Sequence, residues 1–286
     1  MTGTSVTGTT LPRTLFVDGL RVVGYHPDSE HAVAQPAFGD PKAPTLLLLH
    51  GIGGSADSCA PLAGILADLG IHAWCLDAAG YGESADPTSV HHHDFVADVL
   101  TVAEAVSPGR PVVLLGTSWG GVIAASAALR RPDLVAGLVL ADSARGSGTS
   151  PAKADAMRAR AADMKLRGPA VLADERAAHL VAPGADPAIA ESVRVSMASV
   201  RDSGFSAAAE FMASADLGPL LGQISCPTAV VVGEADVITG VEESRLLAES
   251  IPGARLYEVA GAGHVAIQEQ PAIVAAHVLQ LLEGLS

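Results

Sequence analysis

The chain has 286 residues, of which 49% are hydrophobic, 17% are charged and only 3% are aromatic. This aliphatic content suffices for one large buried core and excludes a chain that is disordered throughout. The formal net charge of −14 at pH 7 would repel phosphate groups, so neither a nucleic acid nor an anionic membrane surface is an expected partner.

The cysteines and the N-terminal residues bear on the compartment. The three cysteines are widely spaced and odd in number, which fits neither a disulfide framework nor a metal site, so we expect buried, reduced thiols at Cys59, Cys75 and Cys226. Residues 1–11 hold no basic residue and no apolar segment, unlike a secretory signal, and we expect residues 1–13 to form a flexible tail. No apolar run approaches the roughly 18 residues of a membrane span. The sequence therefore predicts a soluble, cytoplasmic protein.

From Thr14 onward, short aliphatic runs alternate with Ala-rich helical stretches, which is typical of an α/β fold. The first two runs are separated by Asp18 and Gly19, a pair that suits a tight turn between antiparallel strands. The later runs are almost continuously aliphatic, as strands buried on both faces require. The predicted strands are Thr14–Asp18, Leu20–Tyr25, Thr45–Leu49, Ala73–Leu76, Pro111–Leu115, Gly137–Ala141, Thr228–Val232 and Arg255–Val259. The sequence thus predicts an eight-stranded, mostly parallel sheet flanked by helices.

Residues 143–217 interrupt this alternation with helical pieces punctuated by Pro and Gly. The expected helices are Pro151–Arg167, Pro169–Leu180, Pro187–Val200 and Ser206–Ala215. We interpret the segment as a helical cap inserted into a core of residues 14–142 and 218–286. Two interpretations of its large apolar side chains stay open, since they could pack the cap onto the core or line an adaptable pocket. The candidate pocket residues in the cap are Met157, Phe205, Phe211 and Met212.

The strongest motif is the pentapeptide Gly116–Gly120, which has the form G-x-S-x-G with serine at position 118. It lies between a predicted strand and a helical stretch at 121–130. A sharp turn in this context needs small flanking residues and lifts the serine hydroxyl clear of the sheet. The motif predicts Ser118 as a nucleophile.

A serine hydroxyl needs a base to take its proton, and the base needs an acid to orient it. His264 follows the last predicted strand in Gly261–His264, and Asp236 follows the strand 228–232, which gives the chain order Ser, Asp, His. Asp142 also ends a predicted strand and is a rival for the acid. The triplet His91–His93 does not predict a metal site, because consecutive helical residues cannot all face one ion.

The tetrahedral intermediate of acyl transfer needs backbone donors for its oxyanion. The stretch His50–Gly54 follows a predicted strand, and its glycines allow the backbone to turn toward the nucleophile. We expect the N–H of Ile52, or alternatively of Gly53, to be one donor and the N–H of Trp119 the other. A phosphate-binding role for these glycines is not expected, because no Walker lysine follows them.

Taken together, these motifs resemble the α/β-hydrolase superfamily, and the resemblance covers nearly the whole chain from Thr14. The matching motifs appear in the family's order: His50–Gly51, Asp77–Ser84, Gly116–Gly120, Gly233–Asp236 and Gly263–His264. The resemblance implies an eight-stranded, mostly parallel sheet with the cap inserted after the sixth strand. It also implies that Asp77–Ser84 is a structural loop.

Within the superfamily, the stretches Thr117–Gly121 and Leu140–Ser143 are similar to 3-oxoadipate enol-lactonases and related small esterases. Haloalkane dehalogenases and epoxide hydrolases of this fold use an aspartate nucleophile, so the serine at position 118 disfavours both.

The sequence therefore predicts a serine hydrolase that cleaves a small carboxylic ester or lactone through an acyl-enzyme, without a cofactor or a metal. If the substrate carries a carboxylate, Arg145 is the expected cation, and Gly53 is a further candidate for substrate binding. Four alternatives stay open on the same fold. They are hydrolysis of a carbon–carbon bond in a vinylogous diketone, thioesterase activity, cofactor-free perhydrolysis and a small-molecule receptor. The oligomeric state is not predicted.

Overall fold

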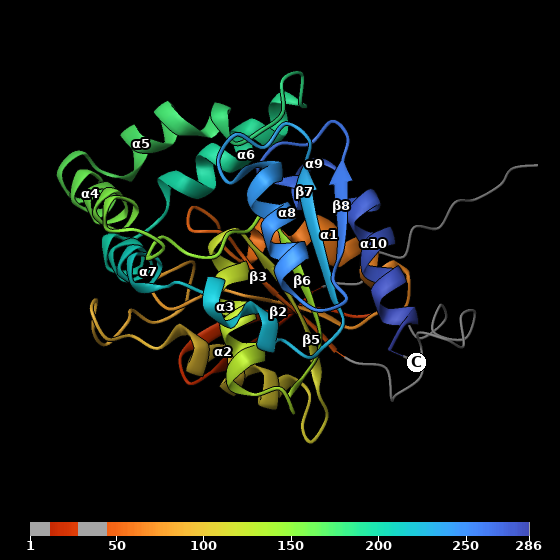
Figure 1. Ribbon diagram of the computed structural model, residues 1–286. Helices are drawn as coiled ribbons and strands as arrows, with labels where there is room; N and C mark the ends of the chain where they lie inside the picture. The colour runs from red at the N-terminus through yellow and green to blue at the C-terminus, as the bar shows by residue number, and fades with distance from the viewer. Residues whose placement is uncertain (1–11, 28–44, 286) are drawn as a thin grey trace, which may run out of the picture.

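The computed structural model in Figure 1 describes residues 12–27 and 45–285. Its strands form one eight-stranded sheet in the order β1-β2-β4-β3-β5-β6-β7-β8. Their bounds are β1 (Arg13–Val17), β2 (Leu20–Tyr25), β3 (Thr45–Leu49), β4 (Ala73–Leu76), β5 (Val112–Thr117), β6 (Val135–Ala141), β7 (Thr228–Gly233) and β8 (Arg255–Val259). β2 pairs antiparallel with β1 and β4, and the other pairs are parallel. The predicted fold is confirmed.

The boundary of the predicted N-terminal tail needs correction at Arg13. Residues 1–11 lie outside the described residues, but Arg13 opens β1 because it pairs with Gly24 in the antiparallel ladder. β6 likewise begins two residues before the predicted Gly137, where Val135 pairs with Val112.

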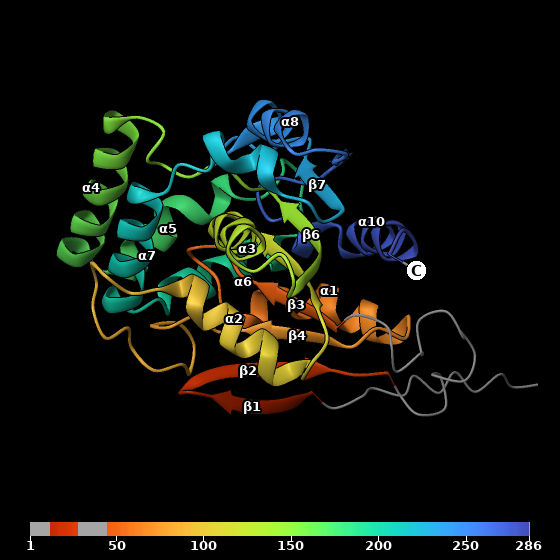
Figure 2. The ribbon, with the colours of Figure 1, turned by 60° about the horizontal axis from the view of Figure 1, so that its bottom comes forward.

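Helices cover both faces of the sheet because each central strand is apolar on both sides. In β3, Leu47 and Leu49 belong to the cluster that α2 (Phe95–Val106), α3 (Trp119–Arg130) and α8 (Gly240–Ser250) cover. Leu46 and Leu48 point the other way, as alternate strand residues must, and pack with α1 (Ala56–Asp68), α9 (Ala266–Glu269) and α10 (Pro271–Glu283). Figures 1 and 2 show the sheet enclosed between these helices.

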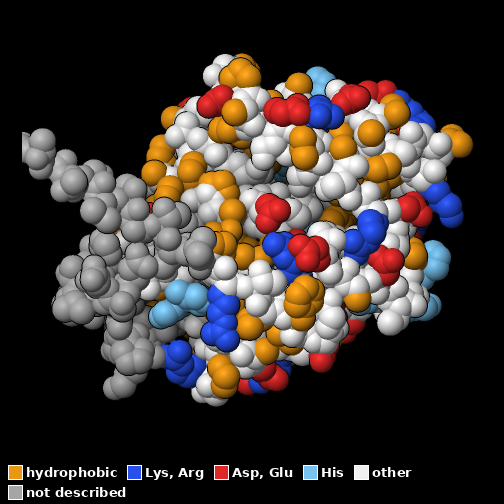
Figure 3. Space-filling model, turned by 180° about the vertical axis from the view of Figure 1, so that it is seen from behind, with side chains coloured by type: hydrophobic (Ala, Val, Ile, Leu, Met, Phe, Trp, Pro, Cys, Tyr) orange, Lys and Arg blue, Asp and Glu red, His pale blue; other side chains and the backbone are white. Residues whose placement is uncertain are grey.

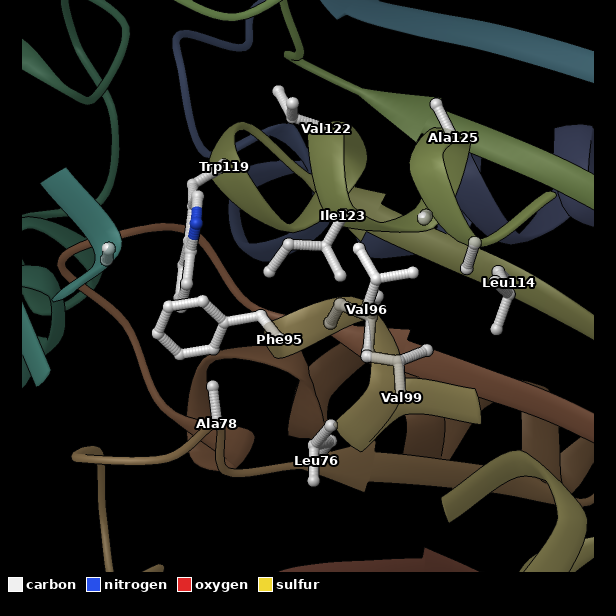
Figure 4. Packing of buried hydrophobic residues seen from close by; sticks show 14 of the residues in the cluster. Leu76, Ala78, Phe95, Val96, Val99, Leu114, Trp119, Val122, Ile123 and Ala125 are labelled. Carbon is white, nitrogen blue, oxygen red and sulfur yellow. The ribbon is translucent and has the colours of Figure 1, made fainter. Parts of the chain in front are cut away.

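One part of the core determines how α2 and α3 meet. The Phe95 ring stands edge-on to the Trp119 indole, with centroids 4.9 Å apart at 89°, and Figure 4 shows both rings above Ala78 and Leu76. Such edge-to-face pairs add about 0.5–1.5 kcal/mol to the stabilisation from burial. The side chain of Trp119, the residue after Ser118, therefore packs in the core.

Between β6 and β7 the chain is helical, and Figure 1 shows α4, α5, α6 and α7 together at one end of the molecule. The elements are α4 (Pro151–Arg167), α5 (Pro169–Arg176), the 3₁₀ turn η1 (Ala177–His179), α6 (Pro187–Ala198), α7 (Asp202–Ser214) and the 3₁₀ turn η2 (Gly218–Gln223). Three of the four helices end earlier than predicted, and α7 also begins earlier, at Asp202, where an acidic residue suits the first turn. We keep the name cap for residues 143–217.

The cap contacts the core at the loop that follows β4. A Cβ added to Gly204 of α7 would lie 2.4 Å from the carbonyl oxygen of Gly80, so the two backbones touch. Arg201, at the start of α7, donates to Asp86 Oδ1 at 2.8 Å and to the carbonyl oxygen of Gly82 at 2.6 Å. The loop itself is held by Asp77, whose carboxylate accepts the N–H of Ala56 at 2.6 Å and pairs with Arg21 at 2.8 Å.

The remaining general expectations concern thiols, charges and membrane spans. Cys59 and Cys75 are buried free thiols, whereas Cys226 is half-buried. On the face in Figure 3, acidic and basic side chains are interspersed and no broad basic area is seen on the described surface. Among the described residues, no helix has both the length and the apolar character needed to cross a bilayer.

Candidate active site

Ser118 occupies a tight turn between β5 and α3. Its backbone lies in the left-handed region, with φ 54° and ψ −116°. The turn needs glycine at position 116, because a Cβ there would come within 2.2 Å of the Gly120 carbonyl oxygen. The Ser118 N–H donates to the Ala141 carbonyl at 2.8 Å, and Ser143 Oγ donates to the Ser118 carbonyl at 2.8 Å. Such a strained turn is the local geometry that exposes a nucleophile in this type of motif.

His264 and Asp236 come from the loops after β8 and β7 and complete a hydrogen-bonded chain with Ser118. The Ser118 Oγ lies 3.0 Å from His264 Nε2, and His264 Nδ1 lies 3.0 Å from Asp236 Oδ2. Both His264 and Asp236 are buried. The sequence-predicted Ser, His and Asp side chains therefore lie together in the order that proton transfer requires.

Further donors hold Asp236 in its ionised form. Its carboxylate accepts Thr239 Oγ1 at 2.6 Å and the Ile238 N–H at 2.8 Å. Burial tends to raise the pKa of Asp236, but the hydrogen bond and charge of His264, together with the bonds from Thr239 and Ile238, lower the pKa to about 2. A carboxylate is therefore available to orient the His264 ring at neutral pH.

Asp142, the rival acid, has different partners. Its side chain is fully buried at the end of β6 and accepts the N–H groups of Gly233 and Ala266, each at 2.9 Å. Among the described residues it makes no hydrogen bond with His264. Burial raises the pKa of Asp142 to about 7, against the opposing effects of His264 and the two backbone donors. The geometry thus separates two aspartates that the sequence pattern left as alternatives.

The loop after β3 presents the predicted oxyanion donors. A neutral His50 shapes it, since Nδ1–H donates to the Gly51 carbonyl at 2.7 Å and Nε2 accepts the Ala78 N–H at 3.2 Å. Burial lowers the pKa of His50, despite the opposing bond to Gly51. Among the described residues, no acceptor bonds to the N–H of Ile52 or of Trp119. Trp119 lies in the first turn of α3, where backbone N–H groups have no partner within the helix.

A cavity of about 770 Å³, counting its open mouth, covers this arrangement. The core lines it with Ser118, His264 and Ile52, and the cap lines it with apolar residues such as Met197 and Phe205. A second cavity of about 420 Å³ adjoins it under the cap and shares Met197 and Phe205 with it. The cap and the core together thus form an apolar pocket with a few polar groups, as small-molecule sites usually are.

Of the predicted pocket residues, Gly53 and Phe205 line both cavities. The other four predicted side chains make contacts elsewhere and line neither cavity. The Met157 sulfur contacts Arg160, Phe211 stands edge-on to Phe95 at 5.9 Å between centroids, Met212 packs against the core, and Arg145 pairs with Glu243 at 2.8 Å.

Sequence reasoning missed two pocket cations, Arg160 and Arg176, and did not select Met197 from the cap methionines. An arginine on an amphipathic helix has the same local pattern whether it faces solvent or a cavity. Of these three residues, only Met197 had a sequence feature that suggested a place in the pocket, because large apolar side chains of the cap were candidates for its lining.

Comparison with known proteins supports the assignment that these motifs imply. Residues 40–271 match the family described as serine aminopeptidase, S33. The chain belongs to this S33 family of α/β-hydrolases. The match spans most of the chain and includes the three residues Ser118, Asp236 and His264.

Individual relatives of this S33 family member include two curated enzymes. The chain is 33% identical over 232 residues to the pimeloyl-[acyl-carrier protein] methyl ester esterase of Chromobacterium violaceum, covering 78% of this chain and 88% of the relative. It is 29% identical over 201 residues to 3-oxoadipate enol-lactonase 2 of Acinetobacter baylyi, covering 69% and 73%. Among solved structures, a thermophilic esterase from Thermogutta terrifontis superposes with a TM-score of 0.81 at 24% identity, covering 96% of this chain and 99% of that one. These matches support a hydrolytic enzyme of the α/β-hydrolase type.

Proposed function

We propose that the protein is a serine hydrolase that cleaves a small carboxylic ester or lactone through an acyl-enzyme. One observation carries the proposal. Ser118, His264 and Asp236 form a continuous chain with 3.0 Å at each hydrogen bond, and the chain borders a cavity beneath the cap. In this proposal residues 143–217 act as the cap that closes over the substrate.

Acylation begins when Ser118 Oγ attacks the carbonyl carbon of the substrate and His264 Nε2 accepts the serine proton. The Asp236 carboxylate, which accepts the Nδ1–H of His264, stabilises the imidazolium that forms. The N–H groups of Ile52 and Trp119 donate to the oxyanion of the tetrahedral intermediate. The intermediate then collapses, the carbon–oxygen bond to the leaving group breaks, and His264 returns the proton to the leaving oxygen.

Deacylation repeats these steps with water as the nucleophile. His264 takes a proton from the water as its oxygen attacks the acyl carbon, and the Ser118 oxygen leaves and regains the proton. An ester releases an alcohol first and then an acid. A lactone keeps its alcohol on the acyl group and leaves as one hydroxy acid.

The names of the relatives support this substrate class, since one is a methyl ester esterase and another an enol-lactonase. The description of the family names a peptidase, and the same groups could attack an amide, so an amide belongs in the test. The free cysteines suit a reducing compartment, which supports a cytoplasmic location for the enzyme and its small-molecule partner.

The test compares the wild type with Ser118→Ala on p-nitrophenyl acetate, with p-nitroacetanilide as the amide arm. We expect the wild type to hydrolyse the ester, Ser118→Ala to lose at least about 10³-fold in kcat, and the amide to be far slower. A fluorophosphonate probe should add one covalent group to the wild type, on the peptide that contains Ser118.

Equal rates for the two proteins would refute the serine esterase and favour a receptor or another chemistry. Faster cleavage of the amide would indicate a peptidase, and faster cleavage of a thioester or a vinylogous diketone would move the assignment to those alternatives.

A further inference from the structure

Two arginines from different cap helices converge on the proposed active site. Arg160 lies in the middle third of α4 and Arg176 ends α5. Both side chains are partly buried, and both line the cavity that Ser118 and His264 line as well as the adjoining one. Two guanidinium groups therefore face the space in which a substrate would lie.

Neither arginine forms an ion pair among the described residues, and this distinguishes the pair from the other cap arginines. Arg176 has only a longer-range electrostatic interaction with Glu175, a residue that pairs with Arg167. Each of the other five cap arginines pairs with a carboxylate: Arg145 with Glu243, Arg158 with Glu210, Arg167 with Asp163, Arg194 with Glu191 and Arg201 with Asp86. Arg160 has only a 3.6 Å contact from Nη1 to the sulfur of Met157. The two cap arginines without an ion pair are thus the two that line the cavity.

An unpaired guanidinium in a sheltered site is unfavourable, because burial removes hydration that no opposite charge replaces. Burial and, to a smaller extent, the like charge of Arg176 lower the pKa of Arg160 to about 10, with Tyr81 opposing the shift. Tyr81 itself is buried, and its hydroxyl has no hydrogen-bond partner among the described residues. These unpaired guanidinium groups therefore favour the binding of an anion at this end of the pocket.

The charges that line the adjoining cavity indicate which anion fits. Besides Arg160 and Arg176, only Asp163 carries charge there, and Asp163 also accepts a hydrogen bond from Arg167 at 3.2 Å. The lining thus has one net positive charge. That charge matches a monoanionic carboxylate better than a dianionic phosphate, which Asp163 would repel more strongly. Guanidinium groups bind carboxylates with paired N–H donors.

We propose that Arg160 and Arg176 bind a carboxylate carried by the substrate, so that the enzyme acts on esters or lactones with a free carboxylate beyond an apolar spacer. Apolar side chains shared by the two cavities, Met197 and Phe205, would contact the spacer. This proposal rests on the proposed serine hydrolase function, and it reassigns to Arg160 and Arg176 the role that the sequence suggested for Arg145.

The test uses two esters of equal length that differ only in the terminal group, mono-p-nitrophenyl adipate and p-nitrophenyl hexanoate. We expect the wild type to prefer the adipate ester by about 10- to 100-fold in kcat/KM, chiefly through KM, and to lose the preference as NaCl is raised. Arg160→Gln and Arg176→Gln should each reduce the ratio of the two kcat/KM values by about 10-fold. Using a ratio within each variant cancels a general loss of folded enzyme.

The matched control is Arg158→Gln, on the same helix as Arg160 but paired with Glu210 and absent from the lining of both cavities. This variant should keep the wild-type ratio. A wild-type ratio near one, or a ratio unchanged in both Arg160→Gln and Arg176→Gln, would overturn the proposal. Stronger inhibition of hexanoate ester hydrolysis by hexyl phosphate than by hexanoate would overturn the choice of carboxylate.

A failure of the proposed function has a separate signature. If the wild type hydrolyses neither ester faster than Ser118→Ala, isothermal titration with hexanoate still tests the arginine pair. Binding that is at least about 10-fold weaker in Arg160→Gln and Arg176→Gln than in Arg158→Gln would then support the anion site in a protein that is not an esterase. Equal binding, or none, would refute it.

Discussion

The carboxylate of Asp142 accepts the backbone N–H of Ala266 at 2.9 Å, two residues after His264. Its other oxygen accepts the N–H of Gly233 at 2.9 Å, three residues before Asp236. One buried side chain thus joins the loop that carries the base to the loop that carries its acid. This makes Asp142 a positioning residue, whereas Asp236 is the group that contacts His264.

The two aspartates should respond differently to the same substitution. Asp236→Asn removes the charge that stabilises the His264 imidazolium, and we expect kcat to fall by about 10⁴-fold. Asp142→Asn places an amide N–H₂ against a backbone N–H, which leaves a buried donor unpaired. We expect this variant to lose about 1–3 kcal/mol of unfolding free energy and less activity than Asp236→Asn. Steady-state kinetics and urea denaturation measure both quantities, and a larger loss of kcat in Asp142→Asn would reverse the assignment.

The stabilising effect of Asp142 should depend on pH. Because burial raises the pKa of Asp142 from 3.8 to about 7 in the folded protein, its contribution to stability is fully present below pH 3.8 and is lost as the pH rises through 7. The stability difference between the wild type and Asp142→Asn should therefore be larger at pH 5 than at pH 8, by on the order of 2 kcal/mol. Urea denaturation at the two pH values checks this, and a difference that grows with pH would contradict it.

His50 should act in the opposite direction. Burial lowers its pKa below the ordinary 6.5, so the neutral ring stabilises the protein above pH 6.5, and this contribution is lost as the pH falls through the lowered value. His50→Asn can still donate to the Gly51 carbonyl but does not titrate. We expect the wild type to lose more unfolding free energy than His50→Asn between pH 8 and pH 5. Parallel loss in both proteins would show that the acid sensitivity arises elsewhere.

The contact between Gly80 and Gly204 should be essential for docking the cap. Gly80 has φ +84°, and a Cβ on it would lie 2.2 Å from the Gly204 Cα. We expect Gly80→Ala and Gly204→Ala each to lose about 2–4 kcal/mol, from backbone clash and, at Gly80, from the left-handed backbone. The control is Gly64→Ala on α1, where a Cβ meets nothing within 4 Å and alanine should stabilise the helix by up to about 1 kcal/mol. Urea denaturation measures all three, and equal stabilities would refute the contact.

The sequence by itself determined the sheet and the three residues that the structure brings together. Aliphatic strand runs, each followed by a glycine-rich or acidic turn, are local patterns that the chain shows without its neighbours. Since the carboxyl ends of parallel strands meet at one edge, Ser118, Asp236 and His264 could be assigned to a single site from their places after strands. Asp142 also follows a strand, so the same rule applies to it. The sequence pattern therefore favoured Asp236 as the acid but did not exclude Asp142.

Only the tertiary structure decided which aspartate reaches His264 and which cap side chains face the cavity. Asp142 and Asp236 end neighbouring strands, and a bond of 3.0 Å to His264 depends on the path of the loop after β7. In the cap, Arg158 and Arg160 lie two residues apart on the Ala-rich helix α4, yet Arg158 pairs with Glu210 and Arg160 lines the pocket. Whether a charged side chain is paired or buried depends on how separate helices pack. The spacing of residues along one helix does not predict that packing.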